Sequence, residues 1–328
     1  MKSKNKIALT GTPIENNLSE YWSIFDFVNH GYLGKLGDFK KSYINAIEKE
    51  ENMHSLNNLK TITQPFILRR LKTDDEIINN LPDKISNDLY CNLSPKQAVL
   101  YNETLNSYME NIEKLDSINR RGKIFELINS LKQICNHPAQ LSKSRKVDIK
   151  DSGKMQLLIN TLESILEGNE KVLIFTQYVQ MGKIIKRVLE DKFDEDVLFL
   201  HGSLSRYKRD KLVRKFQSDD DSRIFVLSLK AGGTGLNLTA ACNVIHYDLW
   251  WNPAVENQAT DRAYRIGQEA NVMVYRFITT GTFEEKINDM LEDKQELADI
   301  AIGSGGKFIT EMDDETLKEL FKLRNRIE

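Results

Sequence analysis

The chain has 328 residues, of which 40% are hydrophobic and 29% charged, with a formal net charge of −2. This length favours two domains, and the near-neutral charge excludes nucleic-acid binding through overall charge, so that any such binding needs a local patch. Three cysteines, far apart in sequence, favour a reducing compartment over a disulfide framework. No signal peptide and no apolar run of membrane length is present, so we predict a cytoplasmic protein that does not bind membranes.

The first part of the chain predicts one short strand and then irregular helices. Residues 6–10 are mostly apolar and lead into the turn Gly11-Thr12-Pro13, as a short strand would. Because no earlier strand could pair with it, we expect the chain to begin inside a domain. From Ser19 to about Lys72 the apolar spacing is helical and is interrupted by glycines.

Two longer helices and an exposed linker follow. The pair Ser94-Pro95 joins a capping residue to a proline at the first helical position, which predicts a helix start. A second helix is predicted over about 123–134, and Asn136-His137-Pro138 ends it. Residues 141–153 are rich in Lys, Ser and Asp and are expected to be a linker.

After residue 153 the pattern changes to short apolar runs separated by helical segments. Runs that are apolar on both faces are typical of buried parallel strands, which predicts a doubly wound α/β domain. The predicted strands are 172–175, 197–200, 224–229, 244–247 and 272–278, the helices between them include 179–192 and 205–217, and helices near 283–300 and within 313–328 end the chain. Ligands of such sheets bind at the carboxyl ends of the strands.

Polar or glycine-rich segments follow four of these strands. Phe175–Tyr178 presents hydroxyl and amide groups that could donate to phosphate or sugar oxygens, although an ordinary polar strand end has the same pattern. Ser205 is a plausible N-cap for a strongly basic helix, either a solvated face or a phosphate track. The segment Lys230–Asn237 contains three glycines that allow close backbone approach to a ligand. In Asp248–Pro253 two adjacent tryptophans cannot both enter one core, so either one meets a partner or Trp251 packs under the next helix.

The stretch 258–268 carries the most suggestive charge pattern. On a helix, Gln258, Arg262 and Arg265 would share one face, where two guanidiniums form a fork suited to phosphate oxygens. The alternative is a solvated helix whose arginines pair with Asp261 or Glu256.

Several motifs are missing. The chain has no phosphate-binding loop of the Gly-x-x-x-x-Gly-Lys-Ser/Thr kind, and no apolar strand ends in an acidic pair that could hold Mg²⁺. Cys135 and His137 are only two potential ligands, so we predict no metal site.

Together these segments resemble the SWI/SNF-type ATPases, which are DNA translocases of helicase superfamily two, and the ending resembles bacterial members. The segments that carry the resemblance are Leu9–Asn16, Gln133–Pro138, Leu173–Tyr178, Leu200–Ser203, Leu227–Leu238, Asp248–Pro253 and Gln258–Gln268. The resemblance implies a RecA-like parallel sheet with helices on both faces, preceded by mainly helical insertions.

The resemblance also implies a division of the chain. Its parts would be the end of a first RecA-like lobe (1–17), a helical insertion (18–75), a linker (76–93), a second helical insertion (94–140), a linker (141–153), the second RecA-like lobe (154–280), and a brace helix with a C-terminal tail (281–328). The main groups that bind ATP and Mg²⁺ would belong to a first lobe that precedes residue 1. The expected partners are that lobe and double-stranded DNA, and we expect a monomer.

Individual roles follow from the same resemblance. Arg262 and Arg265 would act as arginine fingers, Gln258 would help to position them, and Gly235, Asn237 and Asp261 would lie near the nucleotide. The residues expected to contact DNA are Thr10, Gly11, Thr12, Thr176, Gln177, Ser203, Lys230, Gly232, Gly233, Trp250 and Trp251.

The function predicted from these residues is the C-terminal portion of an ATP-dependent double-stranded DNA translocase, inactive in ATP hydrolysis on its own. Two alternatives remain open: a non-catalytic DNA-binding or regulatory module, and an RNA helicase lobe. A translocase of this kind in a bacterium would be cytoplasmic and associated with the nucleoid.

Overall fold

The structure is a computed structural model with two compact units. We call the first the helical unit (residues 1–80, 252–255 and 291–305) and the second the sheet unit (residues 81–251, 256–290 and 306–328). The structure describes residues 3–10, 18–48, 52–68, 81–112, 117–228, 235–293, 309 and 312–324.

The helical unit is a small bundle around an apolar core. Its elements are α1 (Leu18–Val28), α2 (Leu36–Phe39), η1 (Lys40–Ile44), α3 (Asn45–Glu48), α4 (Met53–Thr63) and η2 (Gln64–Phe66). Leu18, Phe39 and Leu56 lie at its centre, each 1% exposed. The strand predicted over residues 6–10 is wrong: this segment has no regular structure, and Leu9 is 95% exposed. A strand is stable only when a neighbour pairs with it.

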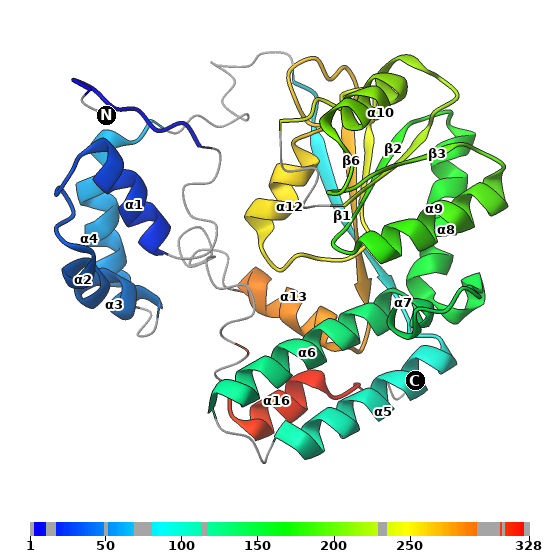
Figure 1. Ribbon diagram of the computed structural model, residues 1–328, viewed down its shortest axis with the longest axis horizontal. Helices are drawn as coiled ribbons and strands as arrows, with labels where there is room; N and C mark the ends of the chain where they lie inside the picture. Colours follow the sequence, from blue (N-terminus) through cyan, green and yellow to red (C-terminus); the bar gives the residue numbers. More distant parts are fainter. Residues whose placement is uncertain are drawn as a thin grey trace. The chain divides into compact units, whose positions relative to one another are not determined.

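The sheet unit contains six parallel strands in the order β1-β6-β5-β2-β4-β3 (Figure 1). The strands are β1 (Lys84–Cys91), β2 (Val172–Thr176), β3 (Val197–Leu200), β4 (Ile224–Ser228), β5 (Asn243–His246) and β6 (Val272–Thr279). The five predicted strands and the RecA-like fold class are confirmed. The segment 76–93, predicted to be a linker, instead supplies β1, which pairs with β6 from Lys84↔Val272 to Cys91↔Thr279.

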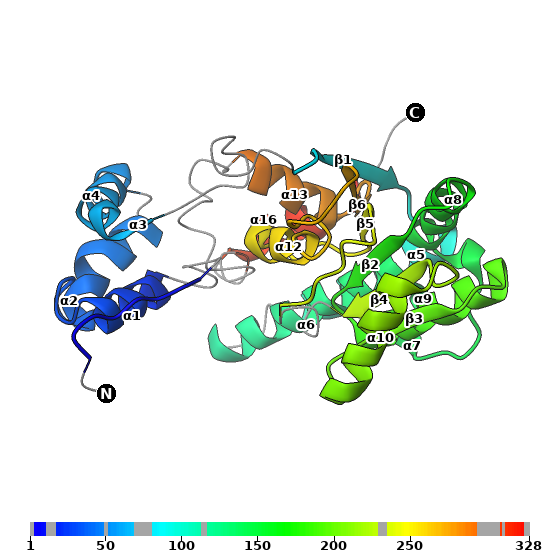
Figure 2. The same cartoon turned by 90° about the horizontal axis from the view of Figure 1, so that it is seen from above.

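Alternating side chains of the strands pack against two layers of helices. Within β2, Val172 and Ile174 join the cluster formed with α8 (Gly153–Glu167) and α9 (Val179–Phe193), whereas Leu173 and Phe175 join the opposite cluster. The opposite cluster includes residues of α10 (Arg206–Ser218) and α12 (Pro253–Thr260). Figure 2 shows α8 and α10 on opposite sides of the sheet. The period of two in the strands therefore produces a core on each face.

A helical hairpin lies beside the sheet, formed by α5 (Pro95–Ile112) and α6 (Ser117–Asn136), and α7 (Pro138–Ser142) follows it. The predicted start at Ser94 is confirmed as a capping box, because Ser94 Oγ accepts from Gln97 N at 3.1 Å and Gln97 Oε1 accepts from Ser94 N at 3.0 Å. His137 caps α7, its Nδ1 accepting from Ala139 N at 3.0 Å.

The last two helices, α13 (Phe283–Asp293) and α16 (Asp314–Phe321), close this side of the sheet unit. Tyr101 in α5 donates to Phe321 O at 2.8 Å, and Arg120 in α6 donates to Asp314 at 2.7 Å. The ring centroids of Phe283 and Phe321 are 5.6 Å apart. The predicted helix within 313–328 is therefore confirmed and holds α13 and the hairpin together.

Replacing Gly182 with alanine is expected to lower the free energy of unfolding by about 1–3 kcal/mol, because overpacking forces neighbouring atoms to move. A Cβ at Gly182 in α9 would lie 2.5 Å from Cε2 of the partly buried ring of Phe199. Gly122 in α6 is the matched control, since a Cβ there meets nothing within 4 Å. Gly122→Ala should be stabilising by about 0.5–1 kcal/mol. Urea unfolding measures both, and an equal response of the two variants would contradict the packing argument.

Candidate functional site

The carboxyl ends of the parallel strands bring the predicted site segments to one edge of the sheet. β2 ends at Thr176, β3 at Leu200 and β5 at His246, and these strands are parallel. The segments that follow them therefore leave the sheet on the same side, which is where ligands of open α/β sheets bind.

Asp248, just after β5, is the buried anchor of this edge. Its carboxylate accepts from Thr176 Oγ1 at 2.5 Å, from Gln177 N at 2.8 Å and from Asn136 Nδ2 at 3.2 Å. Burial raises the pKa of Asp248, and the hydrogen bond from Thr176 opposes that rise. Asp248 thus joins the end of β2 to the end of α6.

The two tryptophans after Asp248 have different surroundings. Trp250 is half-buried against the α10 side of the sheet, and its backbone N–H donates to Glu256 Oε1 at 2.7 Å. Trp251 is 7% exposed, with its ring centroid 3.5 Å from Lys132 Nζ in α6 and 5.5 Å from that of Phe283. Trp251 therefore packs inside the protein, as the alternative predicted, but against α6 and α13 and not under the helix of 258–268.

Direct DNA contact is not supported for two of the predicted residues. Thr176 is fully buried and its hydroxyl donates to Asp248, while the ring of Trp251 is turned into the protein. Buried side chains of this kind can set the position of a surface segment but cannot themselves reach a phosphate. The side chain of Gln177 is also held by a hydrogen bond within the protein, since its Nε2 donates to Leu249 O at 2.6 Å.

The predicted helix over 258–268 is wrong in its second half. α12 ends at Thr260, so Gln258 lies on the helix whereas Arg262 and Arg265 lie in the turns that follow. The chain turns there because Gln268 Nε2 donates to the carbonyl oxygens of Thr239, Ala241 and Ala263, at 3.2, 2.9 and 3.2 Å. The three side chains therefore do not share one helix face.

These turns nevertheless bring the arginines beside the end of the glycine-rich segment. Leu238 N donates to Arg262 O at 2.9 Å, and Arg265 Nη1 donates to Leu236 O at 3.1 Å. Gly235 and Asn237, predicted to lie near the nucleotide, are exposed on this segment. Burial and the neighbouring guanidinium of Arg265 lower the pKa of Arg262, and Asp261 opposes this. A bound anion would relieve the repulsion between two guanidiniums.

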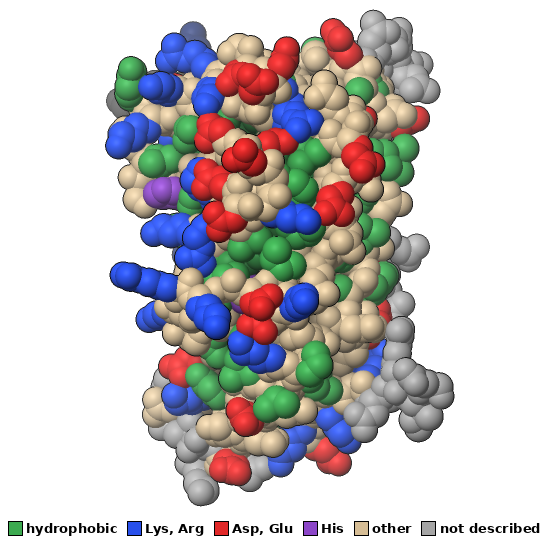
Figure 3. Space-filling view, turned by 90° about the vertical axis from the view of Figure 1, so that its right-hand side faces the viewer, with side chains coloured by type: hydrophobic (Ala, Val, Ile, Leu, Met, Phe, Trp, Pro, Cys, Tyr) green, Lys and Arg blue, Asp and Glu red, His purple; other side chains and the backbone are tan. Residues whose placement is uncertain are grey.

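The basic helix α10 is capped as predicted, because Ser205 Oγ accepts from Lys208 N at 3.5 Å. Arg209 folds back to donate to Gly202 O at 2.7 Å, and Lys215 pairs with Asp196. The exposed cations of this helix are Arg206, Lys208, Lys211 and Arg214. Figure 3 shows Lys and Arg side chains gathered along the left margin of the face that it views.

Several predicted site residues are exposed or lie outside the described ranges. Thr10 and Ser203 are exposed, and Ser203 Oγ lies 2.9 Å from His201 Nδ1. Gly11, Thr12, Lys230, Gly232 and Gly233 lie outside the described residues. Across the described ranges, no three His, Cys, Asp or Glu side chains are grouped as metal ligands, and no helix is long and apolar enough to cross a membrane.

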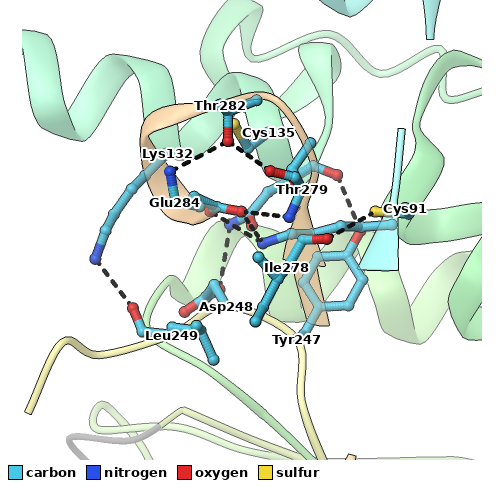
Figure 4. A network of polar contacts seen from close by, with 12 residues as sticks. Cys91, Lys132, Cys135, Tyr247, Asp248, Leu249, Ile278, Thr279, Thr282 and Glu284 are labelled. Atoms are coloured by element: carbon cyan, nitrogen blue, oxygen red, sulfur yellow. Dashed lines mark hydrogen bonds and ion pairs between the residues drawn. The ribbon is translucent and has the colours of Figure 1, made fainter. Parts of the chain in front are cut away.

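A buried ion pair beside this edge was not predicted from the sequence. Nζ of Lys154 in α8 and Oε2 of Glu284 in α13 are 2.8 Å apart, with side chains 0% and 1% exposed. Glu284 also accepts from Thr279 N at 3.2 Å, as Figure 4 shows. Lys154 precedes Leu158 and Leu162 by four and eight residues, so it lies in line with an apolar helix face. A charge in that register was the signal for a buried partner.

A second residue that was not predicted is Arg276 in β6. It donates from Nη1 to both carboxylate oxygens of Asp88 in β1, at 2.8 and 2.9 Å, from Nε to Glu256 in α12 at 3.2 Å, and from Nη2 to Asn288 in α13 at 2.7 Å. One guanidinium therefore fastens the edge strand and two helices.

His246 at the end of β5 predicts a pH-dependent stability. Burial lowers its pKa from 6.5 to about 4, and its Nε2 lies 2.9 Å from Thr260 Oγ1. The unfolded chain takes up a proton below about pH 6.5 that the folded chain resists, so between pH 6.5 and 4 the free energy of unfolding should fall by about 3 kcal/mol because of His246.

Urea unfolding at several pH values measures this fall in the free energy of unfolding. In His246→Gln the part of the fall that comes from His246 should be absent. The matched control is His54→Gln, since His54 is exposed on α4. This variant should show the same dependence of the free energy of unfolding on pH as the wild type. If the free energy of unfolding falls equally with pH in the wild type and in His246→Gln, His246 is not the source of the pH dependence.

Two family models match the chain in succession. The model described as SNF2-related domain matches residues 1–140, and the model described as Helicase conserved C-terminal domain matches residues 153–267. Residues 1–140 include Asn136, which contacts Asp248, and residues 153–267 contain the segments that follow β2, β3 and β5.

The chain is also similar to curated and solved proteins. It is 50% identical over 325 residues to the putative ATP-dependent helicase/translocase YwqA of Bacillus subtilis, covering 98% of this chain and 35% of that protein. The Sulfolobus solfataricus SWI2/SNF2 ATPase core in complex with dsDNA has a TM-score of 0.68 and 45% identity, covering 97% of this chain and 67% of that one. The C-terminal domain of the same ATPase has a TM-score of 0.65 and 41% identity, covering 74% and 100%. The chain spans about a third of the length of YwqA and of two Mycoplasma helicases that it also matches.

Proposed function

Because this chain belongs to the SNF2 family of ATP-dependent helicases and translocases, we propose that it is the C-terminal portion of a motor that moves along double-stranded DNA. The observation that carries the proposal is the pairing of the Gly235–Leu238 segment with the Arg262–Arg265 turns, beside the carboxyl edge of the sheet. This pairing gathers exposed backbone and two guanidiniums, which suits a nucleotide phosphate.

The nucleotide side of this edge is formed by the residues that the pairing gathers. ATP with Mg²⁺ supplies the phosphoryl group whose transfer to water drives such motors. Arg262 and Arg265 stabilise negative charge on that group, with Gln258 and Asp261 flanking them on the same stretch of chain. Gly235 and Asn237 are exposed beside the arginines, so their position can report whether a nucleotide is bound.

The DNA side is formed by the other strand ends. Gln177, Ser203, Lys230, Gly232, Gly233 and Trp250, together with Thr10, Gly11 and Thr12, contact the DNA backbone in this proposal. Thr176 and Trp251 act from beneath, because both are buried and each is the chain neighbour of a residue, Gln177 or Trp250, that would touch DNA. The exposed cations of α10 extend the contact to further phosphates. Contacts of this kind read duplex shape and not base sequence.

The proposal assigns the remaining catalytic groups to a first RecA-like lobe, whose last segment is residues 1–17. The helical insertions are 18–75 and 94–140, the second lobe is 154–280 with β1 added from the intervening segment, and 281–328 forms the brace helix and tail. On this division the chain by itself is monomeric and does not hydrolyse ATP. Such a motor would act in the cytoplasm, at the nucleoid of a bacterium.

ATP hydrolysis by this chain, alone and joined to its first lobe, tests the proposal. We expect duplex DNA to stimulate hydrolysis by the joined protein, single-stranded RNA to have little effect, and the chain alone to release no phosphate. A joined protein that binds duplex DNA without hydrolysing ATP would establish the non-catalytic module instead. Stimulation by RNA in preference to duplex DNA would establish the RNA helicase alternative.

A further inference from the structure

Lys132 is a buried cation near the C-terminal end of α6, far in sequence from the strand ends assigned above. It is 6% exposed, and its Nζ donates to Leu249 O at 3.0 Å (Figure 4). The same ammonium lies 3.5 Å from the ring centroid of Trp251, within cation–π distance. Lys132 therefore contacts two residues of the segment Leu249–Trp251 at once.

The segment that Lys132 contacts is held in an unfavourable conformation. Trp251 has a φ of 57°, in the left-handed region that a bulky side chain rarely adopts. Among the described residues its buried indole Nε1 has no hydrogen-bond partner. The ring is fixed between Lys132 on α6 and the edge-on ring of Phe283 on α13. Such costs persist only where the surroundings impose the conformation, and they are common at functional sites.

The carbonyl of Leu249 links Lys132 to the DNA side of the sheet edge. It accepts from Lys132 at 3.0 Å and from Gln177 Nε2 at 2.6 Å, so one oxygen joins α6 to the end of β2. A movement of Lys132 would change the position of Leu249 and with it that of the Gln177 amide.

The charge of Lys132 is costly and is not balanced by an ion pair. Within the described part of the chain, no carboxylate pairs with its ammonium. Asp248, Glu284 and Glu256 face it and favour the charged form, whereas Lys154 opposes that form. Burial dominates and lowers the pKa of Lys132 to about 8. A hydrophobic side chain would fill this space at lower cost, so the ammonium is expected to have a role.

We infer that Lys132 is a positioning residue through which the α5–α6 hairpin holds the Leu249–Trp251 segment and the Gln177 side chain in the arrangement that responds to DNA. The inference rests on the proposed motor function and adds to it a coupling residue outside the strand ends. It assigns the hairpin a role in converting DNA binding into faster ATP hydrolysis.

The test compares Lys132→Met, Lys132→Arg and the control Lys123→Met in the protein joined to its first lobe. Lys123 lies on the same helix, but its side chain is 43% exposed and pairs with Glu126. Lys132→Met should lower the ratio of kcat with saturating duplex DNA to kcat without DNA at least roughly tenfold, since one charge-assisted hydrogen bond and one cation–π contact are lost. Lys132→Arg should retain most of that ratio, and Lys123→Met should retain all of it.

A pH profile separates this role from a merely structural one. In the wild type the DNA stimulation ratio should fall as the pH rises through about 8, because Lys132 loses its proton there. In Lys132→Arg the ratio should stay level over the same range, because a guanidinium remains charged. An unchanged ratio in Lys132→Met, or identical pH profiles in the wild type and Lys132→Arg, would overturn the inference.

A second measurement needs no ATP hydrolysis. Three tryptophans occur in the chain, so Trp22→Phe with Trp250→Phe leaves Trp251 as the only indole. Its fluorescence should change through about pH 8 when Lys132 is present and should not change in Lys132→Arg. If the joined wild-type protein does not hydrolyse ATP, the proposed function fails, and this titration still decides whether Lys132 controls the segment. A fluorescence signal that is level across this pH range in both proteins refutes that control.

Discussion

Replacing Arg262 with alanine is expected to lower the DNA-stimulated kcat of the joined protein by about 10³-fold or more, as the loss of an arginine finger does in phosphoryl-transfer enzymes. The backbone around Arg262 should survive the change, because its carbonyl accepts from Leu238 N and its own N–H donates to Ala259 O. The loss would therefore fall on the guanidinium and not on the turn that carries it.

Two further variants make this prediction specific. Arg262→Lys keeps one positive charge but loses the planar fork, so its activity should remain far below that of the wild type. Arg145→Ala removes an arginine that is exposed in the segment after α7, and it should leave kcat unchanged. If Arg262→Ala hydrolyses ATP at the wild-type rate, Arg262 has only a structural role.

Arg265 should behave differently from Arg262 in the same assay. Its Nη1 donates to Leu236 O, so it also holds the segment that carries Gly235 and Asn237. Arg265→Ala should therefore raise the KM for ATP as well as lower kcat, whereas Arg262→Ala should act mainly on kcat.

Replacing Lys154 with methionine is the second change with a large expected effect. Burial is the largest single influence on Lys154 and lowers its pKa, but Glu284, with smaller contributions from Cys135 and Cys91, reverses this and holds the pKa above its ordinary value. Lys154→Met leaves Glu284 buried without its cation, which should lower the free energy of unfolding by about 3–5 kcal/mol.

The double variant Lys154→Met, Glu284→Met should lose much less stability, because it removes both buried charges, although Thr279 N then loses its acceptor. The exposed pair Lys192–Glu163, at 3.3 Å, supplies the control, and Lys192→Met should change the free energy of unfolding by about 1 kcal/mol or less. Urea unfolding followed by the fluorescence of Trp250 and Trp251, in a Trp22→Phe background, reports on the sheet unit. A loss below about 1 kcal/mol in Lys154→Met would show that the pair contributes as little as a surface pair.

The central strands could be predicted from the sequence because both of their faces are buried. Runs such as Val172–Phe175 are apolar throughout, and a short continuous run of this kind is typical of a strand in the middle of a parallel sheet. β1 could not be found in this way. Its sequence, Lys-Ile-Ser-Asn-Asp-Leu-Tyr-Cys, is half polar and has no continuous apolar run, since an edge strand is half-exposed and its Asp88 is needed by Arg276.

The site was predictable in part for a similar reason. Segments that follow parallel strands must meet at one edge, so the neighbourhood of Gln177, Asp248 and Trp250 follows from topology. Helical spacing was a poor guide to Arg262, because Gln268 fixes a turn through three carbonyl groups, two of which lie far from it in sequence. The pair Lys154–Glu284 joins residues 130 positions apart, and spacing within a helix does not name such a partner.

The pairing of β1 with β6 has a consequence for synthesis of the protein in the cell. Asp88 and its partner Arg276 are 188 positions apart, so β1 leaves the ribosome long before β6. At usual elongation rates this delay is roughly 10–40 s. Throughout that time the nascent β1 has no strand to pair with, and when β6 emerges its free edge can be taken by another chain. Slower translation between residues 92 and 271, or a chaperone bound to the nascent segment, should therefore change the yield of folded protein more than its final stability.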